Sequence, residues 1–305
     1  MAGPAWVLER PGTEHPGTVL RRLLEGEPIV VAPGAFNPLV GLIARKVGFR
    51  ALYFSGAAFS ASMGLPDLGL FTLTELSQAV RQLFRATGLP IVVDADTGFG
   101  EALNVAAAVR ELEEAGAAAI QIEDQEMPKK CGHLSGKSVV AAEEMVAKVA
   151  AAARVRREAL IVARTDARAT HGLSEAVRRA RLYLEAGADV IFPEALESEE
   201  EFRTFARQVP APLLANMTEW GKTPYLSVEQ FRAMGYKMVV FPVSTLRVAA
   251  RAVEEVLVAI RERGTQADLL DRMQTRRELY DLIGYEEYER FDRGLAEEGR
   301  HRAGS

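Results

Sequence analysis

Short apolar runs recur along the chain, and longer stretches with helical periodicity lie between them. Each run is apolar almost throughout instead of alternating with polar residues, which is typical of a parallel strand covered on both faces. We therefore predict eight strands, at residues 29–32, 51–54, 91–93, 119–122, 160–163, 190–192, 213–215 and 238–241.

Helical patterns follow most of these runs, and the clearest cover residues 74–86, 102–115, 142–155, 174–186 and 245–263. Glycine, which is favoured just past a helix end, stands where helices return to the next strand, at Gly48, Gly88, Gly116, Gly187 and Gly235. Eight β–α units predict an α/β fold of the (β/α)8 TIM-barrel type, with residues 1–305 in a single domain. A doubly wound sheet is the alternative, but eight even units favour closure.

The pattern changes after residue 263. Residues 266–298 read as charged amphipathic helices that include Tyr280, Tyr285, Tyr288 and Phe291. This composition is too apolar for a disordered tail. We expect residues 264–298 to form a C-terminal helical extension that packs on its own barrel or on a neighbouring subunit.

Composition narrows the class of protein. With 305 residues, 48% of them apolar and 26% charged, the chain is long and apolar enough for a sizeable core. A net charge of −5 without a long basic run argues against nucleic acid or an anionic membrane as the main partner. One cysteine excludes an intrachain disulfide. Residues 1–10 lack a signal-peptide pattern and no apolar run reaches the length of a membrane span, so we expect a soluble, cytoplasmic protein.

Polar residues stand at the ends of seven of the eight expected strands. They are Ser55 and Gly56, Asp94 to Gly98, Glu123 and Asp124, Arg164 to Asp166, Glu194, Asn216 to Thr218, and Ser244 with Arg247. In a barrel these ends form one rim, where active sites lie. A purely structural barrel has little reason to gather polar groups there, because buried polar groups must be paired.

Asp94 and Asp96 are two residues apart, so in an extended segment their carboxylates point the same way. With Glu123 they offer oxygen ligands for a hard cation such as Mg2+. The alternative for an Asp-x-Asp segment is a helix cap with a salt bridge. The strand end and the nearby Glu123 favour the metal site.

The single cysteine, Cys131, stands in the segment Lys129-Lys130-Cys131-Gly132-His133. A lone cysteine is usually a small buried apolar residue, but charged and small neighbours suit a partly exposed loop. We expect Lys129, Lys130 and His133 to favour the thiolate and lower the pKa of Cys131. Cys131 is thus the candidate acid/base, with Lys130 and His133 as further catalytic candidates.

Three arginines, Arg164, Arg247 and Arg276, could bind substrate carboxylates through two parallel hydrogen bonds. Surface ion pairing is the ordinary alternative for an arginine. For Arg164, directly at a strand end, we favour carboxylate binding. The four histidines have no zinc-site spacing.

Several segments match one family in register along the chain, from Ala32 to Tyr285. They are Tyr53 to Gly56, Asp94 to Gly100, Ile122 to Gln125, Lys129 to His133, Ala163 to Ala167, Phe192 to Ala195, Asn216 to Glu219 and Met273 to Arg276. Through these segments the chain resembles the isocitrate lyase / phosphoenolpyruvate mutase superfamily. Any one match is weak, but many in register are specific.

The resemblance implies a role for each matched position. Mg2+, or Mn2+ in its place, would be held by Asp94 and Asp96, with Asp67 and Glu123 supporting its shell through water. The implied substrate contacts are Ser55, Gly56, Ala57, Gly132, Arg164, Glu194, Asn216, Thr218, Arg247 and Arg276. The family often has glycine at the position of Ala57, which puts that contact in doubt. The resemblance also implies a helix-swapped barrel in a homotetramer.

The implied activity is a Mg2+-dependent C–C lyase that cleaves 2-methylisocitrate to pyruvate and succinate by retro-Claisen-type chemistry, in propionate catabolism (the methylcitrate cycle). Phe192 and Val240 are candidates for an apolar pocket around the substrate methyl group. The loop 125–138 carries three Gly or Pro residues and is expected to close over the substrate.

Other activities remain as alternatives. Isocitrate lyases share the Cys131 loop but are usually longer, whereas phosphonomutases and oxaloacetate decarboxylases generally lack it. A catalytically inactive barrel serving as a binding module would have a broken metal or acid site, and none of these motif positions is broken.

Overall fold

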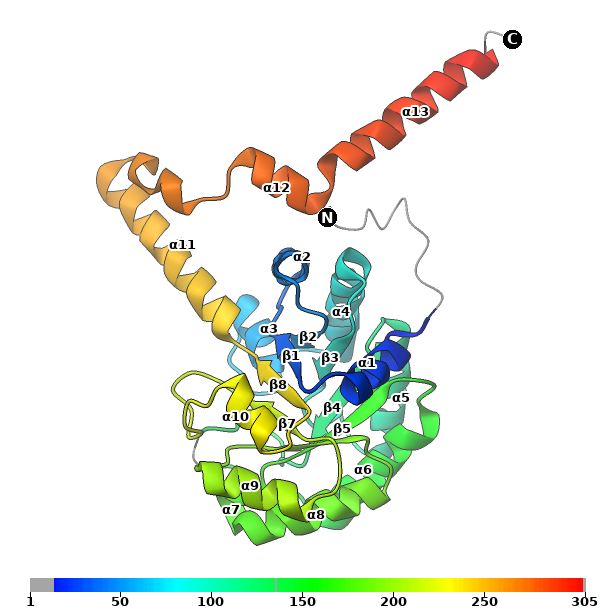
Figure 1. The fold of residues 1–305 in the computed structure, drawn as a ribbon, viewed down its shortest axis with the longest axis vertical. Helices are drawn as coiled ribbons and strands as arrows, with labels where there is room; N and C mark the ends of the chain where they lie inside the picture. The colour runs from blue at the N-terminus through cyan, green and yellow to red at the C-terminus, as the bar shows by residue number, and fades with distance from the viewer. Residues whose placement is uncertain (1–13, 135, 304–305) are drawn as a thin grey trace.

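The computed structural model describes residues 14–134 and 136–303, in which strands and helices alternate along most of the chain (Figure 1). The expected absence of a signal peptide concerns residues 1–10, which lie outside the described residues. No helix in the described part combines the length and the apolar character that a membrane span needs.

Every strand pair is parallel, and the eight expected strands are confirmed within one or two residues at each end. One sheet has the order β1 (Val30–Pro33), β8 (Met238–Phe241), β7 (Leu214–Asn216). The other has the order β2 (Leu52–Phe54), β3 (Ile91–Asp94), β4 (Ala119–Glu123), β5 (Leu160–Thr165), β6 (Val190–Pro193). Isolated parallel bridges, Gly34 to Tyr53 and Ile191 to Leu213, join the two sheets at both of their edges.

The strands are buried on both faces, as their apolar runs predict. In β3 the side chain of Val92 belongs to an inner apolar cluster that collects residues from both sheets, whereas Val93 faces an outer cluster shared with the helices. Helix α1 (Pro16–Gly26) contributes Leu20 and Leu23 to the inner cluster. This helix was not among those expected from the sequence, although its apolar residues Val19, Leu20, Leu23 and Leu24 have helical spacing.

Helices connect consecutive strands, and those expected from the sequence agree within one residue at each end. The five expected helices are α4 (Leu73–Thr87), α5 (Ala102–Glu114), α6 (Ala142–Val155), α8 (Leu173–Glu185) and α11 (Ser244–Arg263). The structure adds α2 (Pro38–Val47), α3 (Gly56–Ser62), α7 (Ala167–His171), α9 (Glu199–Gln208) and α10 (Val228–Ala233). The expected glycine ends are present: Gly48 (φ 106°) ends α2 and Gly88 (φ 63°) ends α4 in the left-handed region.

The C-terminal elements leave the body of the molecule. Figure 1 shows α11 (Ser244–Arg263) rising away from β8, followed by η1 (Ala267–Arg272), α12 (Arg276–Ile283) and α13 (Tyr285–Ala303). Helix α12 packs against α2 of its own chain. On α11, Val248, Val253 and Leu257 are 71%, 57% and 60% exposed, so much of its apolar surface is uncovered within one chain. The extension is helical, as expected.

Candidate active site

The strand ends meet at one cavity, and most of the candidate residues line it. Its lining includes Ser55, Ala57, Asp67, Asp94, Lys129, Lys130, Cys131, Gly132, His133, Arg164, Glu194, Asn216, Thr218 and Arg247. Gly56, Asp96 and Glu123 are in contact with these residues but outside the lining. Arg276 stands apart, because it lies exposed at the start of α12 and is not part of the lining.

The apolar part of the lining differs from the expectation. Phe192 lines the cavity, but Val240 lies fully buried in the inner cluster. Pro242 and Val243, which follow β8, line the cavity instead.

Backbone strain collects around this cavity. Asp96 (φ 48°), Ala195 (φ 56°) and Trp220 (φ 54°) are non-glycine residues in the left-handed region. Each follows a strand end, after β3, β6 and β7. Such conformations persist only where surrounding structure enforces them, and they cluster at functional sites.

The three acidic candidates differ in how they are satisfied. Asp94 accepts hydrogen bonds from the backbone N–H of Gly56 (3.1 Å) and of Asp96 (3.2 Å) and from Nε2 of Gln121 (3.0 Å). In contrast, the buried carboxylates of Asp96 and Glu123 accept no geometrically regular hydrogen bond from the described residues. Each is contacted only by a charged side chain: Lys129 lies 2.6 Å from Asp96, and Arg164 lies 3.1 Å from Glu123. Buried oxygens without regular hydrogen bonds are suited to a cation.

A cation of the chain's own lies in this acidic cluster. The ammonium group of Lys129, 2.6 Å from Oδ1 of Asp96, also pairs with Asp67. Burial raises the pKa of Asp96 to about 7 despite Lys129, while the surrounding carboxylates raise the pKa of Lys129 against the effect of its own burial. No three acidic, thiol or imidazole groups of the described residues form a ready metal cage. Asp94, Asp96 and water nevertheless fit Mg2+, which takes one or two carboxylates.

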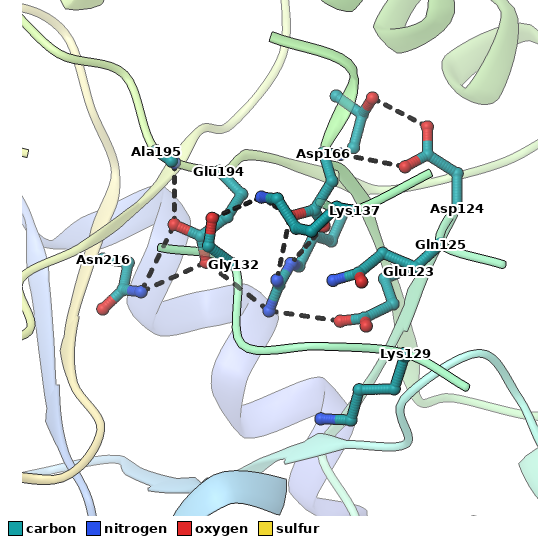
Figure 2. A network of polar contacts seen from close by, with 12 residues as sticks. Glu123, Asp124, Gln125, Lys129, Gly132, Lys137, Asp166, Glu194, Ala195 and Asn216 are labelled. Carbon is teal, nitrogen blue, oxygen red and sulfur yellow. Dashed lines mark hydrogen bonds and ion pairs between the residues drawn. The ribbon is translucent and has the colours of Figure 1, made fainter. Parts of the chain in front are cut away.

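Arg164 lies at the centre of a second cluster, and Figure 2 shows Glu123, Asp166 and Glu194, its three partners, gathered there. Its guanidinium lies 3.1 Å from Glu123, 3.4 Å from Glu194 and 2.9 Å from Asp166. All four side chains are at most 9% exposed. Asn216 donates to Glu194 (3.2 Å). An arginine surrounded by three carboxylates remains charged and lies at the cavity wall, where a substrate carboxylate could reach it.

The expected low pKa of Cys131 is wrong. Burial raises the pKa of this half-buried thiol, and Glu194 and Asp67 raise it further, outweighing the nearby Arg164. The ammonium groups of the two lysines that precede Cys131 have other partners. Lys129 pairs with the acidic cluster, and Lys130 donates to the carbonyl oxygen of Gly136 (2.8 Å). The thiol is therefore protonated at neutral pH, which suits a proton donor rather than a nucleophile.

His133 is held as a neutral ring. Its Nδ1 accepts the backbone N–H of Lys222 (3.0 Å), so in the neutral form the proton lies on Nε2, which faces Glu194 at 3.3 Å. Burial lowers the pKa of His133, and this outweighs the effect of Glu194. The ring thus links the Cys131 loop to the segment that follows β7.

Arg247 has an anchored position at the cavity. It donates to the carbonyl oxygen of Glu219 (2.8 Å) and stacks over the ring of Trp220, 5.0 Å from its centroid. Its neighbour in the lining, Thr218, is 8% exposed. The guanidinium of Arg247 also pairs with the carboxylate of Glu219 (3.1 Å), and it lies in the lining, where a bound anion could contact it.

Some residues that shape the site were not singled out from the sequence. Tyr53 donates to Gln121 (2.7 Å), which in turn donates to Asp94. Asp124, at the end of β4, accepts hydrogen bonds from Thr165 (2.7 Å) and Tyr183 (2.8 Å). A polar residue inside an otherwise apolar strand, such as Gln121, is the sequence signal that could have revealed the first network.

A further missed group is Lys137, whose side chain is 1% exposed and lies 2.6 Å from Oδ1 of Asp166. Nothing in the sequence distinguishes this lysine from one on the surface. Together the clusters can bind a cation, hold several carboxylates and present a thiol proton to the bound molecule.

Known proteins resemble this chain in sequence. The model of the family described as phosphoenolpyruvate phosphomutase matches residues 20–261. The 2-methylisocitrate lyase of Aeropyrum pernix is 62% identical over 285 residues, 93% of this chain and 92% of that protein. The 2-methylisocitrate lyase of Halalkalibacterium halodurans is 51% identical over 293 residues, 96% of this chain and 98% of that protein.

Solved structures agree in fold. A crystal structure of 2,3-dimethylmalate lyase superposes with a TM-score of 0.88 at 35% identity, covering 93% of this chain and 96% of that one. Phosphonopyruvate hydrolase in complex with oxalate and Mg2+ gives 0.82 at 31% identity, covering 90% and 97%. With a family model spanning most of its length and relatives this similar over nearly all of it, the chain belongs to the phosphoenolpyruvate phosphomutase family.

Proposed function

We propose that this protein is a Mg2+-dependent 2-methylisocitrate lyase, which cleaves its substrate to pyruvate and succinate. The observation that carries the proposal is a protonated, half-buried Cys131 at a cavity that also holds an acidic cluster and a carboxylate-binding arginine. The relatives named 2-methylisocitrate lyase, 51% and 62% identical over nearly their whole length, support the same substrate.

The metal site would be formed by Asp94 and Asp96, with Asp67 and Glu123 around it. Mg2+ bound there would stabilise the negative charge that develops on the 2-hydroxyl oxygen when this group loses its proton. The buried oxygens of Asp96 and Glu123, which accept no regular hydrogen bond from the described residues, support this assignment. Lys129 would have to give up part of its contact with Asp96.

The remaining residues would bind and orient the substrate. Arg164, Arg247 and Asn216 would hold its carboxylates, with Ser55 and Thr218 beside them. The proton of the 2-hydroxyl group would pass to a carboxylate of the cavity lining as that C–O bond becomes a carbonyl. As the C–C bond breaks, its electron pair passes to the succinate half, where the adjacent carboxylate delocalises it. The S–H proton of Cys131 then neutralises that carbon. Because burial keeps the thiol protonated, the structure supports Cys131 as the acid.

Lys130 and His133 would have supporting roles. The contacts of His133 with Lys222 and Glu194 favour a part in holding the loop rather than in moving a proton. Lys130 is fixed within its own loop by hydrogen bonds to Gln125 and Gly136. We assign both to the geometry of the Cys131 segment.

A parallel assay tests the substrate. Release of pyruvate from 2-methylisocitrate and of glyoxylate from isocitrate is measured side by side, with Mg2+ and with EDTA. We expect mainly pyruvate, and loss of activity with EDTA. Glyoxylate release alone would contradict the assignment.

The fold supports a further part of the proposal. The bridges at both sheet edges support closure of the eight strands into one (β/α)8 barrel domain over residues 1–305, with residues 264–298 as its extension. The exposed apolar side chains of α11 favour a swapped helix that covers a neighbouring barrel in a cytoplasmic homotetramer. In such an assembly Arg276 could approach the cavity of another subunit.

A further inference from the structure

Lys137 is a buried lysine that the reaction described above does not use. It lies on the loop between β4 and α6, and its side chain is 1% exposed. Its ammonium group lies 2.6 Å from Oδ1 of Asp166 and donates a hydrogen bond to the carbonyl oxygen of Gly132 (Figure 2). A lysine is rarely buried, and it remains charged only when paired in this way.

The partner of Lys137 is itself rigidly held. Asp166 is fully buried at the end of β5, accepts from Nε of Arg164 (2.9 Å), and donates its backbone N–H to Asp124 (2.8 Å). Burial alone would raise the pKa of Asp166, but Arg164 and Lys137 outweigh it and hold the pKa at about 2. Asp166 is therefore a fixed negative charge behind the cavity.

Gly132 is pressed against the same cluster. A Cβ atom added at Gly132 would lie 2.4 Å from Cγ of Glu194 and 2.6 Å from Nη2 of Arg164. Gly132 therefore packs directly on the carboxylate-binding residues, and Lys137 donates a hydrogen bond to the carbonyl oxygen of Gly132. The position of the thiol depends on this contact.

The other lysines of the loop cannot replace this anchor. Lys130 donates within the loop, to Gly136. Lys129 pairs with Asp67 and Asp96, the residues that a bound cation would need. Asp166 is not one of these residues, so the anchor at Lys137 is independent of the metal.

The geometry points to Lys137 as a positioning residue that fastens the Cys131–Gly132 segment to Asp166 and so keeps the thiol over the cavity. This inference rests on the proposed function only in that Cys131 is its proton donor. The fastening itself is a property of the loop and can be measured without turnover.

The single cysteine provides that measurement. Alkylation by iodoacetamide, followed by mass spectrometry, reports on Cys131 alone. We compare wild type with Lys137→Met and with Lys148→Met, a matched control whose ammonium group is also largely buried and pairs with Glu144 on α6 (3.1 Å). Rates are taken across pH, so that a change in thiol pKa is separated from a change in access.

We expect alkylation about tenfold faster in Lys137→Met and unchanged in Lys148→Met, with kcat for 2-methylisocitrate reduced about 10–100-fold because the donor is misplaced. Equal rates in wild type and Lys137→Met, or an equal increase in the control, would overturn the inference. A wild type without lyase activity would overturn the proposed function and leave the alkylation result valid.

Chemical rescue keeps the test decisive if Lys137→Met unfolds. Lys137→Ala is assayed with added ethylammonium, which can enter the space of the side chain, and with ethanol at the same concentration. Severalfold recovery of kcat and slower alkylation with ethylammonium alone are expected. No recovery, in a variant whose circular dichroism is native, would assign Lys137 a merely structural role.

Discussion

Buried carboxylates at the two ends of the strands differ in how they are satisfied. At the carboxyl ends, Asp96 and Glu123 accept no regular hydrogen bond from the described residues, and burial raises the pKa of both. At the opposite end, Glu113 accepts the backbone N–H groups of Arg157 (2.8 Å), Glu158 (2.7 Å) and Ala159 (2.7 Å). These donors outweigh burial and lower the pKa of Glu113.

Buried carboxylate side chains thus have different roles at the two ends of the strands. Glu113 fixes the entry to β5 and stabilises the folded chain. Asp96 and Glu123 have ion pairs with Lys129 and Arg164 but no backbone donors, so burial still disfavours their charge and they favour a ligand that brings positive charge. Neutralising one carboxylate at each end should separate activity from stability.

The largest effect is expected for Asp96→Asn. Loss of a metal-binding carboxylate should lower kcat/KM for 2-methylisocitrate about 1000-fold or more, because several kcal/mol of charge stabilisation are lost. The melting temperature should change little, because removal of a carboxylate whose charge burial disfavours offsets the loss of its ion pair with Lys129. Pyruvate release and thermal unfolding measure the two effects. Activity near that of wild type would exclude Asp96 from the metal site.

The next effect concerns the thiol at the same end. Cys131→Ser should lower kcat about 100- to 10,000-fold with a smaller change in KM, because a hydroxyl donates its proton far less readily than a thiol. Stopped assays of pyruvate at saturating substrate provide the measurement. Near-wild-type turnover would remove Cys131 from the mechanism.

Glu113→Ala should have the converse result. Three backbone donors lose their partner, which should lower the free energy of unfolding by about 2–4 kcal/mol. The kcat measured well below the melting temperature should remain unchanged, because Glu113 lies at the far end of the strands. Urea unfolding and the lyase assay are run on the same preparation. A loss of activity without a loss of stability would contradict the division between the ends.

The smallest effect is a pH dependence. Because the folded-state pKa of Glu113 is lowered, its contribution to stability is present above the unfolded carboxyl pKa, about 4.3, and is lost as pH falls through the folded value. Glu113→Gln, which does not titrate, should therefore show a shallower decline in stability between about pH 5 and pH 3. A decline identical to that of wild type would mean that other carboxylates dominate acid unfolding.

The sequence predicts the elements well where one signal decides them. The eight apolar runs gave eight strands, and the polar residues after them meet at one cavity, because parallel strands end at a common edge. Helix α1 was missed although its apolar residues have helical spacing, since it precedes the first strand and lies outside the β–α alternation on which the prediction was based.

The directions of the lysine side chains in the Cys131 loop could not be predicted from the sequence. Burial raises the pKa of the Cys131 thiol, and the neighbouring Lys129 and Lys130 do not offset it, because their ammonium groups pair with Asp96 and Gly136. Conversely, Lys137 lies six residues from Cys131 and helps to fix its loop. Such contacts depend on how the loop folds back on β5.

The position of Lys129 has a consequence for how the chain folds and acquires its metal ion. A cluster of like charges normally opposes folding until a metal arrives, but here a side chain of the same chain offsets part of that repulsion. We therefore expect a newly synthesised chain to fold when magnesium is scarce, and to acquire its ion afterwards by exchange with an internal cation. Folding and metal supply would then be separate events in the cell.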